Sequence, residues 1–243
     1  MPTIDTLNFR NHFVSLSSDF YSNVKPTKLP DANLLHFNHS AANLINLNQT
    51  GDIADWLCGN MLPVNADPVA ALYAGHQFGH FVPQLGDGRA ILLGGIESEH
   101  GYWELQLKGA GPTPYSRNSD GRAVLRSSIR EYLCSEAMHG LGIPTTRALS
   151  LVGSSLPVYR ETVETAAVVM RMSPSFVRFG SFEVFFYRGQ PDAVRALANH
   201  VIQHHYPELN DSDNKYPHFL KAVVNSTARL MPSGKPLALR MAL

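Results

Sequence analysis

The segment 105–133, LQLKGAGPTPYSRNSDGRAVLRSSIREYL, brings together residue types that handle phosphate groups. An alternating apolar run ends at Lys108 and continues into Gly-Ala-Gly-Pro, and a polar loop then leads to a stretch that carries Glu131. Ammonium and backbone donors are the groups that hold phosphate oxygens. A lone lysine at the end of a strand is usually a solvated charge, so Lys108 indicates a phosphate site only if other residues support it.

A glycine-rich turn lies upstream of this segment. Residues 86–89 read Gly-Asp-Gly-Arg, in which Gly86 and Gly88 would let the backbone approach a phosphate and Arg89 would add charge. The same residues also suit an ordinary hairpin turn, because Asp-Gly is a standard hairpin signal. Both interpretations stay open. The sequence has no GxxxxGK[ST] and no GxGxxG that opens a helix, which excludes the P-loop and Rossmann sites.

A strand lysine paired with a helix glutamate, behind a glycine-rich hairpin, is how protein kinases hold the α- and β-phosphates of ATP. We predict a helix over 123–139 that ends at Gly140, with an apolar stripe of Leu125, Ile129, Tyr132 and Leu133. Glu136 falls inside this stripe and Glu131 at its margin. Helical geometry therefore leaves open which glutamate pairs with Lys108.

Periodicity predicts the elements that would position these residues. FVPQ, the turn LGDG and RAILLGGI indicate a hairpin over 81–96, and YWELQLK adds a third antiparallel strand over 102–108. Two further strands are expected within 147–161 and 166–172, and helices over 191–206 and 216–231. Residues 1–80 read as loops and short helices, with a helical segment at 52–62. The order predicts an α+β fold with a small antiparallel-sheet lobe before a helical one.

Composition narrows the classes of function. The chain has 243 residues, 44% of them hydrophobic, and its 20 Lys and Arg balance 20 Asp and Glu. Zero net charge gives no sign of a nucleic-acid or anionic-membrane partner, and no apolar run has the length of a membrane span. The N-terminus lacks a signal-peptide pattern, and Cys58 and Cys134 are far apart without a CxxC motif. We expect a cytoplasmic protein.

The candidate metal ligands in the sequence lack the further ligands or the local structure that a metal site requires. His76 and His80 are four residues apart but lie beside glycines that disfavour a helix, and His200 and His204 have no carboxylate nearby in the sequence. The DSDN run that begins at Asp211 lacks the glycine and glutamate of a calcium loop. We predict no metal site in this chain.

Three blocks of the sequence resemble the selenoprotein O family, also called YdiU or UPF0061. They are YAGHQFGHFVPQLGDGRAILLGG, LQLKGAGPTPYSRNSDGRAVLRSSIREYLCSEAMHGLGIPTTRALSLV and VVMRMSPSFVRFGSFE, and the resemblance extends from Asn38 to Leu230. It implies a protein-kinase-like fold that binds ATP in a flipped orientation. It also implies transfer of AMP to Ser, Thr or Tyr hydroxyls of protein substrates, with Mg²⁺ or Mn²⁺ as the metal in the full-length family.

The resemblance assigns roles to individual residues. Lys108 would contact the phosphates, and its spacing to Glu131 makes that glutamate the ion-pair partner. The other expected ATP-binding residues are Gly86, Gly88 and Arg89 in the covering loop, Asp120 and Gly121 before the helix, and Arg171 and Arg178 after the last strand of the small lobe. The resemblance further divides the chain into an N-terminal extension (1–80), a kinase-like small lobe (81–172) and the start of a helical large lobe (173–231).

The sequence departs from the family pattern at its C-terminal end. The catalytic segment, with an aspartate base and an Asn/Asp pair for the metal, should follow STARL, but the chain reads MPSGKPLALRMAL. Restoring one nucleotide in a permitted back-translation gives MAQWQAVGFAHGVM, which resembles the family's approach to its catalytic loop. We interpret 232–243 as a frameshifted tail. The chain would then lack its base and metal ligands, and we expect weak or no ATP binding and no AMP transfer by it.

Two alternatives to a truncated adenylyltransferase stay open. One is a kinase that transfers the γ-phosphate. The other is a non-catalytic kinase-like module that binds a nucleotide or a partner protein, which the missing catalytic segment favours.

Overall fold

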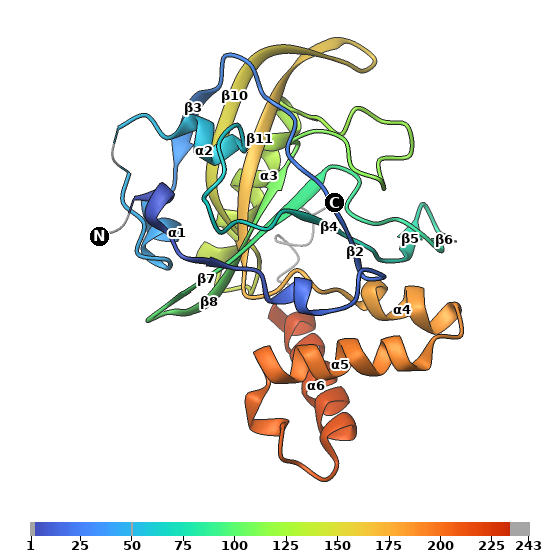
Figure 1. Ribbon diagram of the computed structural model, residues 1–243. Coiled ribbons are helices and arrows are strands. Elements are labelled where there is room, and N and C mark those ends of the chain that lie inside the picture. The colour runs from blue at the N-terminus through green and yellow to red at the C-terminus, as the bar shows by residue number, and fades with distance from the viewer. Residues whose placement is uncertain (1–2, 50, 234–243) are drawn as a thin grey trace.

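The computed structural model describes residues 3–49 and 51–233 and shows an α+β architecture (Figure 1). The strands are β1 (Phe9–Arg10), β2 (Tyr21–Asn23), β3 (Asn33–Phe37), β4 (Val69–Ala71), β5 (Gly75–Gln77), β6 (His80–Val82), β7 (Ala90–Ser98), β8 (Gly101–Lys108), β9 (Ala123–Val124), β10 (Arg147–Tyr159) and β11 (Val163–Ser173). The helices are α1 (His39–Asn43), α2 (Ala54–Cys58), α3 (Leu125–Gly140), α4 (Phe179–Tyr187), α5 (Pro191–His205) and α6 (Lys215–Ser233), with 3₁₀ turns at Ile4–Thr6, His12–Ser15 and Pro207–Leu209.

The main sheet has the order β2-β4-β7-β8-β11-β10-β3, with β1 paired to β7 and β9 to β11, and each of these pairs is antiparallel. The predicted strands at 102–108, 147–161 and 166–172 are confirmed. Residues 1–80 were predicted to form loops and short helices. They also contribute strands β2, β3 and β4, which lie at the two sides of the main sheet. The predicted helical segment at 52–62 is the short helix α2.

The predicted hairpin over 81–96 is wrong. β6 pairs with β5 in a separate two-stranded sheet, and β7 pairs with β4 and β8 instead. The glycine-rich turn lies alongside the end of β4, since the amides of Leu85 and Gly86 donate to the Tyr73 carbonyl and the Asp87 amide donates to the Ala71 carbonyl. These long-range hydrogen bonds decide the path of the turn, which local turn chemistry could not show.

The predicted apolar stripe of α3 is confirmed for Leu125 and Tyr132, which pack on the sheet, but wrong for the other two residues. Ile129 and Leu133 are 40% and 61% exposed, whereas the face toward the sheet carries Ser128, Tyr132 and Ser135. Tyr132 packs against a cluster that β10 and β11 supply, and small serines allow the helix to lie close to them. The helix includes Gly140, and the left-handed residue that follows it is Gly142, with φ +73°.

Two apolar cores lie on opposite sides of the sheet. The larger core joins α1, α2 and the N-terminal segment to one face, including Ile91, Leu105, Leu107, Met170 and Leu57. The second core joins α4 and α5 to the other face. The helices α4–α6 project from the sheet as a separate layer (Figure 1). In the described chain, no helix has the length and apolar character required to cross a bilayer.

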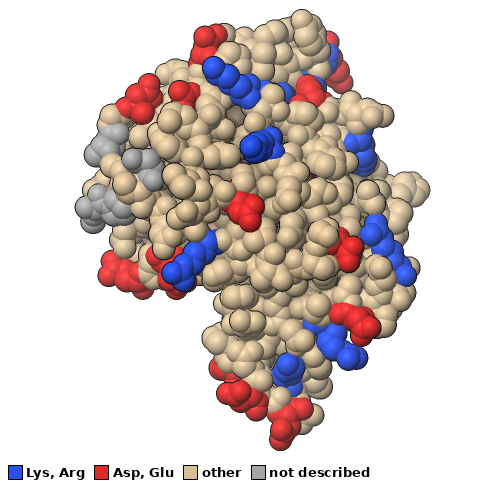
Figure 2. Space-filling view, viewed as in Figure 1, with Lys and Arg blue, Asp and Glu red and all other residues tan. Residues whose placement is uncertain are grey.

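The front face of the molecule has no patch of one charge sign. Figure 2 shows acidic and basic side chains intermingled over this face. The predicted frameshifted tail covers residues 232–243. Of these, residues 234–243 lie outside the described chain.

Candidate functional site

Strand β8 presents one polar face from which the site is built. Its apolar residues Leu105 and Leu107 are buried in the larger core, and the alternate residues Glu104, Gln106 and Lys108 point to the opposite face, as the period of two predicts. Each of the three polar side chains reaches a different element. The Glu104 carboxylate accepts the Phe176 amide at 2.7 Å, Gln106 Nε2 donates to Asp87, and Lys108 contacts α3.

Lys108 pairs with Glu131, and Glu136 has another partner. Lys108 Nζ lies 2.6 Å from Glu131 Oε2, while Glu136 accepts hydrogen bonds from the Arg147 guanidinium and the Ala148 amide. The structure thus decides between the two glutamates that helical geometry left open. The choice follows from the face that α3 turns toward the sheet.

Glu131 serves two cations at once. Arg171 on β11 lies opposite Gln106 in the β8–β11 register, and its Nη1 is 3.1 Å from Glu131 Oε1. Its Nη2 donates to the Gln106 side chain. Burial raises the pKa of the Glu131 carboxyl, but Lys108 and Arg171 outweigh it and hold that pKa below its usual value. Burial and the neighbouring Arg171 lower the pKa of Lys108.

Asp87 anchors the glycine-rich loop. It is buried, and its carboxylate accepts the Ala71 amide and Gln106 Nε2, both at 3.2 Å, while Arg178 Nη2 lies 3.5 Å away. Burial raises the pKa of this carboxyl, and Arg178 opposes the rise. Arg178 precedes α4, and its guanidinium lies 4.5 Å from the centroid of the Tyr73 ring.

A second loop covers the glycine-rich loop. Thr113 Oγ1 donates to the Asp87 carbonyl at 2.7 Å and Ser116 Oγ to the Gly88 carbonyl. A Cβ on Gly86 would lie 2.3 Å from the Tyr115 ring, and a Cβ on Gly88 would lie 2.8 Å from the Tyr115 carbonyl oxygen. Both glycines are therefore required by the packing of the two loops, whatever ligand they also approach.

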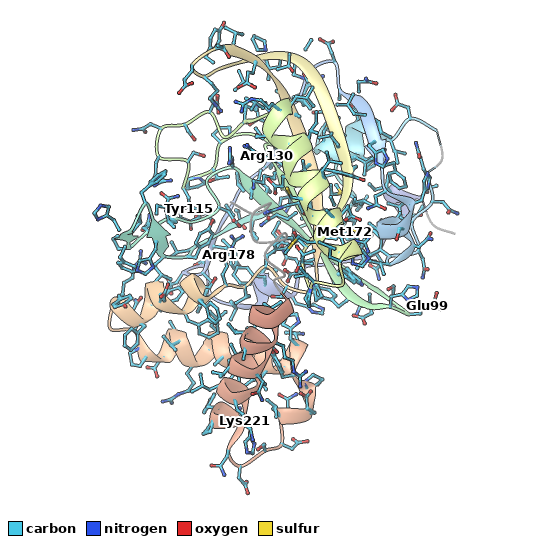
Figure 3. All side chains as sticks on the ribbon, turned by 180° about the vertical axis from the view of Figure 1, so that it is seen from behind. Glu99, Tyr115, Arg130, Met172, Arg178 and Lys221 are labelled. Carbon is cyan, nitrogen blue, oxygen red and sulfur yellow. The ribbon has the colours of Figure 1, made fainter. Side chains whose placement is uncertain are left out.

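These elements enclose a cavity of about 490 Å³. Of the residues expected to bind ATP, six line it, namely Gly86, Gly88, Arg89, Lys108, Arg171 and Arg178. Figure 3 shows Arg178 between the sheet and the helices α4 and α6, on the same side as Tyr115. Residues that the sequence did not single out complete the wall, namely Tyr73, Gln77, Leu85, Asp87, Ala90, Tyr115, Ser116, Arg117, Ser119, Arg122 and Arg160.

The two other expected residues, Asp120 and Gly121, are not among the lining residues of the cavity. The Asp120 carboxylate accepts both Nη atoms of Arg160 at 2.9 Å and the Arg122 amide at 2.9 Å, and Arg160 lowers the pKa of Asp120. Gly121 has φ +64°, and a Cβ there would collide with the Gly111 backbone at 2.1 Å. Arg160 comes from the turn between β10 and β11, about 40 residues from Asp120 in sequence. A short sequence motif around Asp120 could not have identified Arg160 as its partner.

The described residues contain no group of three or more His, Cys, Asp or Glu side chains arranged to hold a metal ion. Of the sequence histidines considered, His200 and His204 lie in a ring cluster with His12, in which the centroids of His12 and His204 are 4.3 Å apart. Burial, then the neighbouring histidines, lower the pKa of His200 to about 4. Above that pH the His200 ring is neutral and serves as a packing group.

Comparison with known proteins identifies the family of this chain. A family model described as protein adenylyltransferase SelO matches residues 3–235, so the chain belongs to the SelO family. It is 57% identical over 236 residues to a protein nucleotidyltransferase YdiU of Thiobacillus denitrificans and 50% identical over 236 residues to one of Myxococcus xanthus. Each alignment covers 95% of this chain and 48% of the relative. The chain spans about half the length of the curated relatives it matches.

Proposed function

We propose that the cavity binds ATP through its phosphate groups. The observation that carries this proposal is the excess of cations in the described wall, which contains Asp87 as its carboxylate against Arg89, Lys108, Arg117, Arg122, Arg160, Arg171 and Arg178. A polyphosphate has the charge that such a wall requires, and arginine forks bind phosphate oxygens in pairs. Gly86, Gly88, Arg89, Lys108, Arg171 and Arg178 contact the nucleotide, while Asp120 and Gly121 shape the loop beneath it.

The cavity needs no residue beyond Arg178, which changes our expectation for binding. The tail at 232–243 suggested weak or no ATP binding, yet every lining residue falls between Tyr73 and Arg178. We therefore expect the chain to bind ATP even if it transfers nothing.

In the whole protein, the proposed activity is transfer of AMP from ATP to Ser, Thr or Tyr hydroxyls of protein substrates in the cytoplasm. Support comes from the relatives named protein nucleotidyltransferase. The antiparallel sheet, the Lys108–Glu131 pair and the helix α3 are also the parts expected of a kinase-like small lobe. Cations around the α-phosphate would stabilise the charge that develops during transfer.

The described residues do not fit a divalent cation, because they contain no cluster of metal-ligating side chains. Mg²⁺ or Mn²⁺ ligands and the catalytic base would belong to the half of the family's length that this chain does not span. The same observation favours a second candidate for the chain itself, a kinase-like module that binds nucleotide without catalysis.

Calorimetric titration of the purified chain with ATP, AMP and adenosine tests the proposal. We expect ATP to bind most tightly and adenosine most weakly, because the wall is cationic. Equal affinities for ATP and adenosine would contradict phosphate recognition. Incubation of acceptor proteins with ATP labelled at the α- or the γ-phosphate then separates the activities: α-label transfer indicates an adenylyltransferase, γ-label transfer a kinase, and binding without transfer the module.

A further inference from the structure

Arg122 is a cation of the cavity wall that neither the motifs nor the resemblance singled out. It lies between Gly121 and strand β9, is 8% exposed and lines the cavity. Its backbone is held on both sides, since its amide donates to Asp120 Oδ1 at 2.9 Å and its carbonyl accepts Arg160 Nη2 at 3.2 Å. Its guanidinium Nη2 donates to the Lys28 carbonyl at 2.9 Å. The backbone of Arg122 and one nitrogen of its guanidinium are therefore held in place before any ligand arrives.

The Arg122 guanidinium lacks the counter-charge that its neighbours have. Ion pairs within the site join Lys108 and Arg171 to Glu131, Arg160 to Asp120, and Arg178 to Asp87. In the described chain, no carboxylate forms an ion pair with the Arg122 guanidinium, and its Nη1 is buried with no hydrogen-bond partner. Burial lowers the pKa of Arg122, with Asp120 opposing the shift, but a guanidinium stays protonated at neutral pH.

A buried cation without a partner is costly, and an anion in the cavity removes that cost. The planar guanidinium, which stays charged, suits a phosphate group better than a single carbonyl. Arg89 and Arg117 also line the cavity without an ion pair in the described chain, but both are exposed to solvent, so their charges are already screened. Arg122 is thus distinguished by burial and by its unsatisfied donor.

We propose that Arg122 is a phosphate-binding residue of this site, whose guanidinium charge faces the nucleotide's polyphosphate from the cavity wall. This inference rests on the proposed ATP site and adds a residue to it. The ligand class is a polyphosphate, either free or as part of a nucleotide. Arg122 adds a cation from the residues just before β9 to those that β8 and β11 supply.

The test compares thermal unfolding of the purified chain with and without inorganic triphosphate, and calorimetric titration with triphosphate, ATP and adenosine. The variants are Arg122→Gln, Arg122→Lys and the control Arg126→Gln, which removes the same charge from an exposed arginine that pairs with Glu164 outside the cavity. We expect Arg122→Gln to weaken triphosphate and ATP binding about tenfold or more and to leave adenosine binding unchanged. Arg122→Lys should lie between the two, and Arg126→Gln should match the wild type.

Thermal unfolding separates a ligand-binding role from a structural one. If Arg122 serves a phosphate, the ligand-free Arg122→Gln protein should melt at or above the wild-type temperature, because an unpaired buried charge is gone, and triphosphate should raise its melting temperature less. Wild-type triphosphate affinity in Arg122→Gln, equal loss of adenosine binding, or no triphosphate binding by the wild type would each overturn the inference. Should Arg122→Gln fail to fold, wild-type triphosphate affinity in Arg122→Lys would overturn it. If triphosphate binds through Arg122 but ATP does not bind, the nucleotide proposal fails and this inference survives.

Discussion

Lys108 Nζ and Glu131 Oε2 lie 2.6 Å apart and join the end of β8 to the middle of α3. The same carboxylate receives Arg171 from β11, so one anion orients two cations that line the cavity. All three side chains are largely buried, and water therefore screens their interaction less than it screens a surface pair. The geometry leaves the cations oriented toward the cavity and available to a polyphosphate.

Replacement of Lys108 by alanine should weaken ATP binding. We expect the Kd to rise roughly 10- to 100-fold, because a hydrogen bond to a charged group contributes about 1.5–3 kcal/mol. Glu131 keeps its contact with Arg171, so the fold should survive. Calorimetry measures the change, with Lys221→Ala as control, since Lys221 lies on α6 away from Arg178 and Tyr115 (Figure 3). An unchanged Kd in Lys108→Ala would remove this lysine from the site.

Glu136 should act on stability rather than on nucleotide binding. Glu136→Gln weakens its contacts with the buried Arg147 guanidinium, and we expect a loss of about 2 kcal/mol in the free energy of unfolding. Urea denaturation measures this loss. Glu164→Gln is the matched control, because Glu164 pairs with the exposed Arg126 and such surface pairs contribute little. Equal stability of the two variants would show that the Glu136–Arg147 pair does not support the fold.

Gly86 should tolerate no side chain. Gly86→Ala places a Cβ 2.3 Å from the Tyr115 ring at a residue whose φ is +63°, so the two loops must separate. Gly79→Ala has a similar φ of +80° with open space around it, and isolates the conformational cost of about 1 kcal/mol. We expect Gly86→Ala to lose about 1–3 kcal/mol more than Gly79→Ala, the range for overpacking. Thermal melts that shift equally for both would contradict this packing.

Glu104 should make stability depend on pH. Burial raises the pKa of its carboxyl to about 8, with the Phe176 amide opposing the rise. Between the ordinary value of 4.5 and 8, the folded protein holds a proton that the unfolded chain releases, so this residue's contribution to stability falls as pH rises. The slope is at most about 1.4 kcal/mol per pH unit.

Glu104→Gln removes this titration and keeps an oxygen for the Phe176 amide. The stability difference between variant and wild type should therefore move in favour of the variant as pH rises from 5 to 8, because other titrations cancel in the comparison. Urea denaturation at pH 5, 6.5 and 8 measures the difference. A difference that is constant with pH would show that Glu104 titrates outside this window.

Local sequence patterns were sufficient to predict the strand that carries Lys108 and the helix that carries Glu131. The alternation of YWELQLK placed Glu104, Gln106 and Lys108 on one face of a strand, and the structure has them on the face that adjoins the cavity. The helix after it also lies close to its predicted range. Hydrophobic periodicity reports such elements because strand and helix repeats depend on neighbouring residues.

The predicted apolar stripe of that helix is correct at Leu125 and Tyr132 and wrong at its other two residues. Leu133 and Ile129 are exposed, and a face with two serines and Tyr132 packs on the sheet. Small residues at a close helix–sheet contact do not stand out in a hydrophobic pattern. For this reason the partner of Lys108 became clear only from the orientation of α3.

The sequence by itself determined the family, the α+β class and six residues of the cavity wall, because these depend on short motifs and on local repeats. Tertiary structure alone decided the path of the glycine-rich loop, which Asp87 ties to β4, and the arrival of Arg160 from a hairpin turn. It also decided that Arg122 is buried without a counter-charge. Burial and ion pairing depend on segments that meet only in the folded chain, so a linear pattern cannot report them.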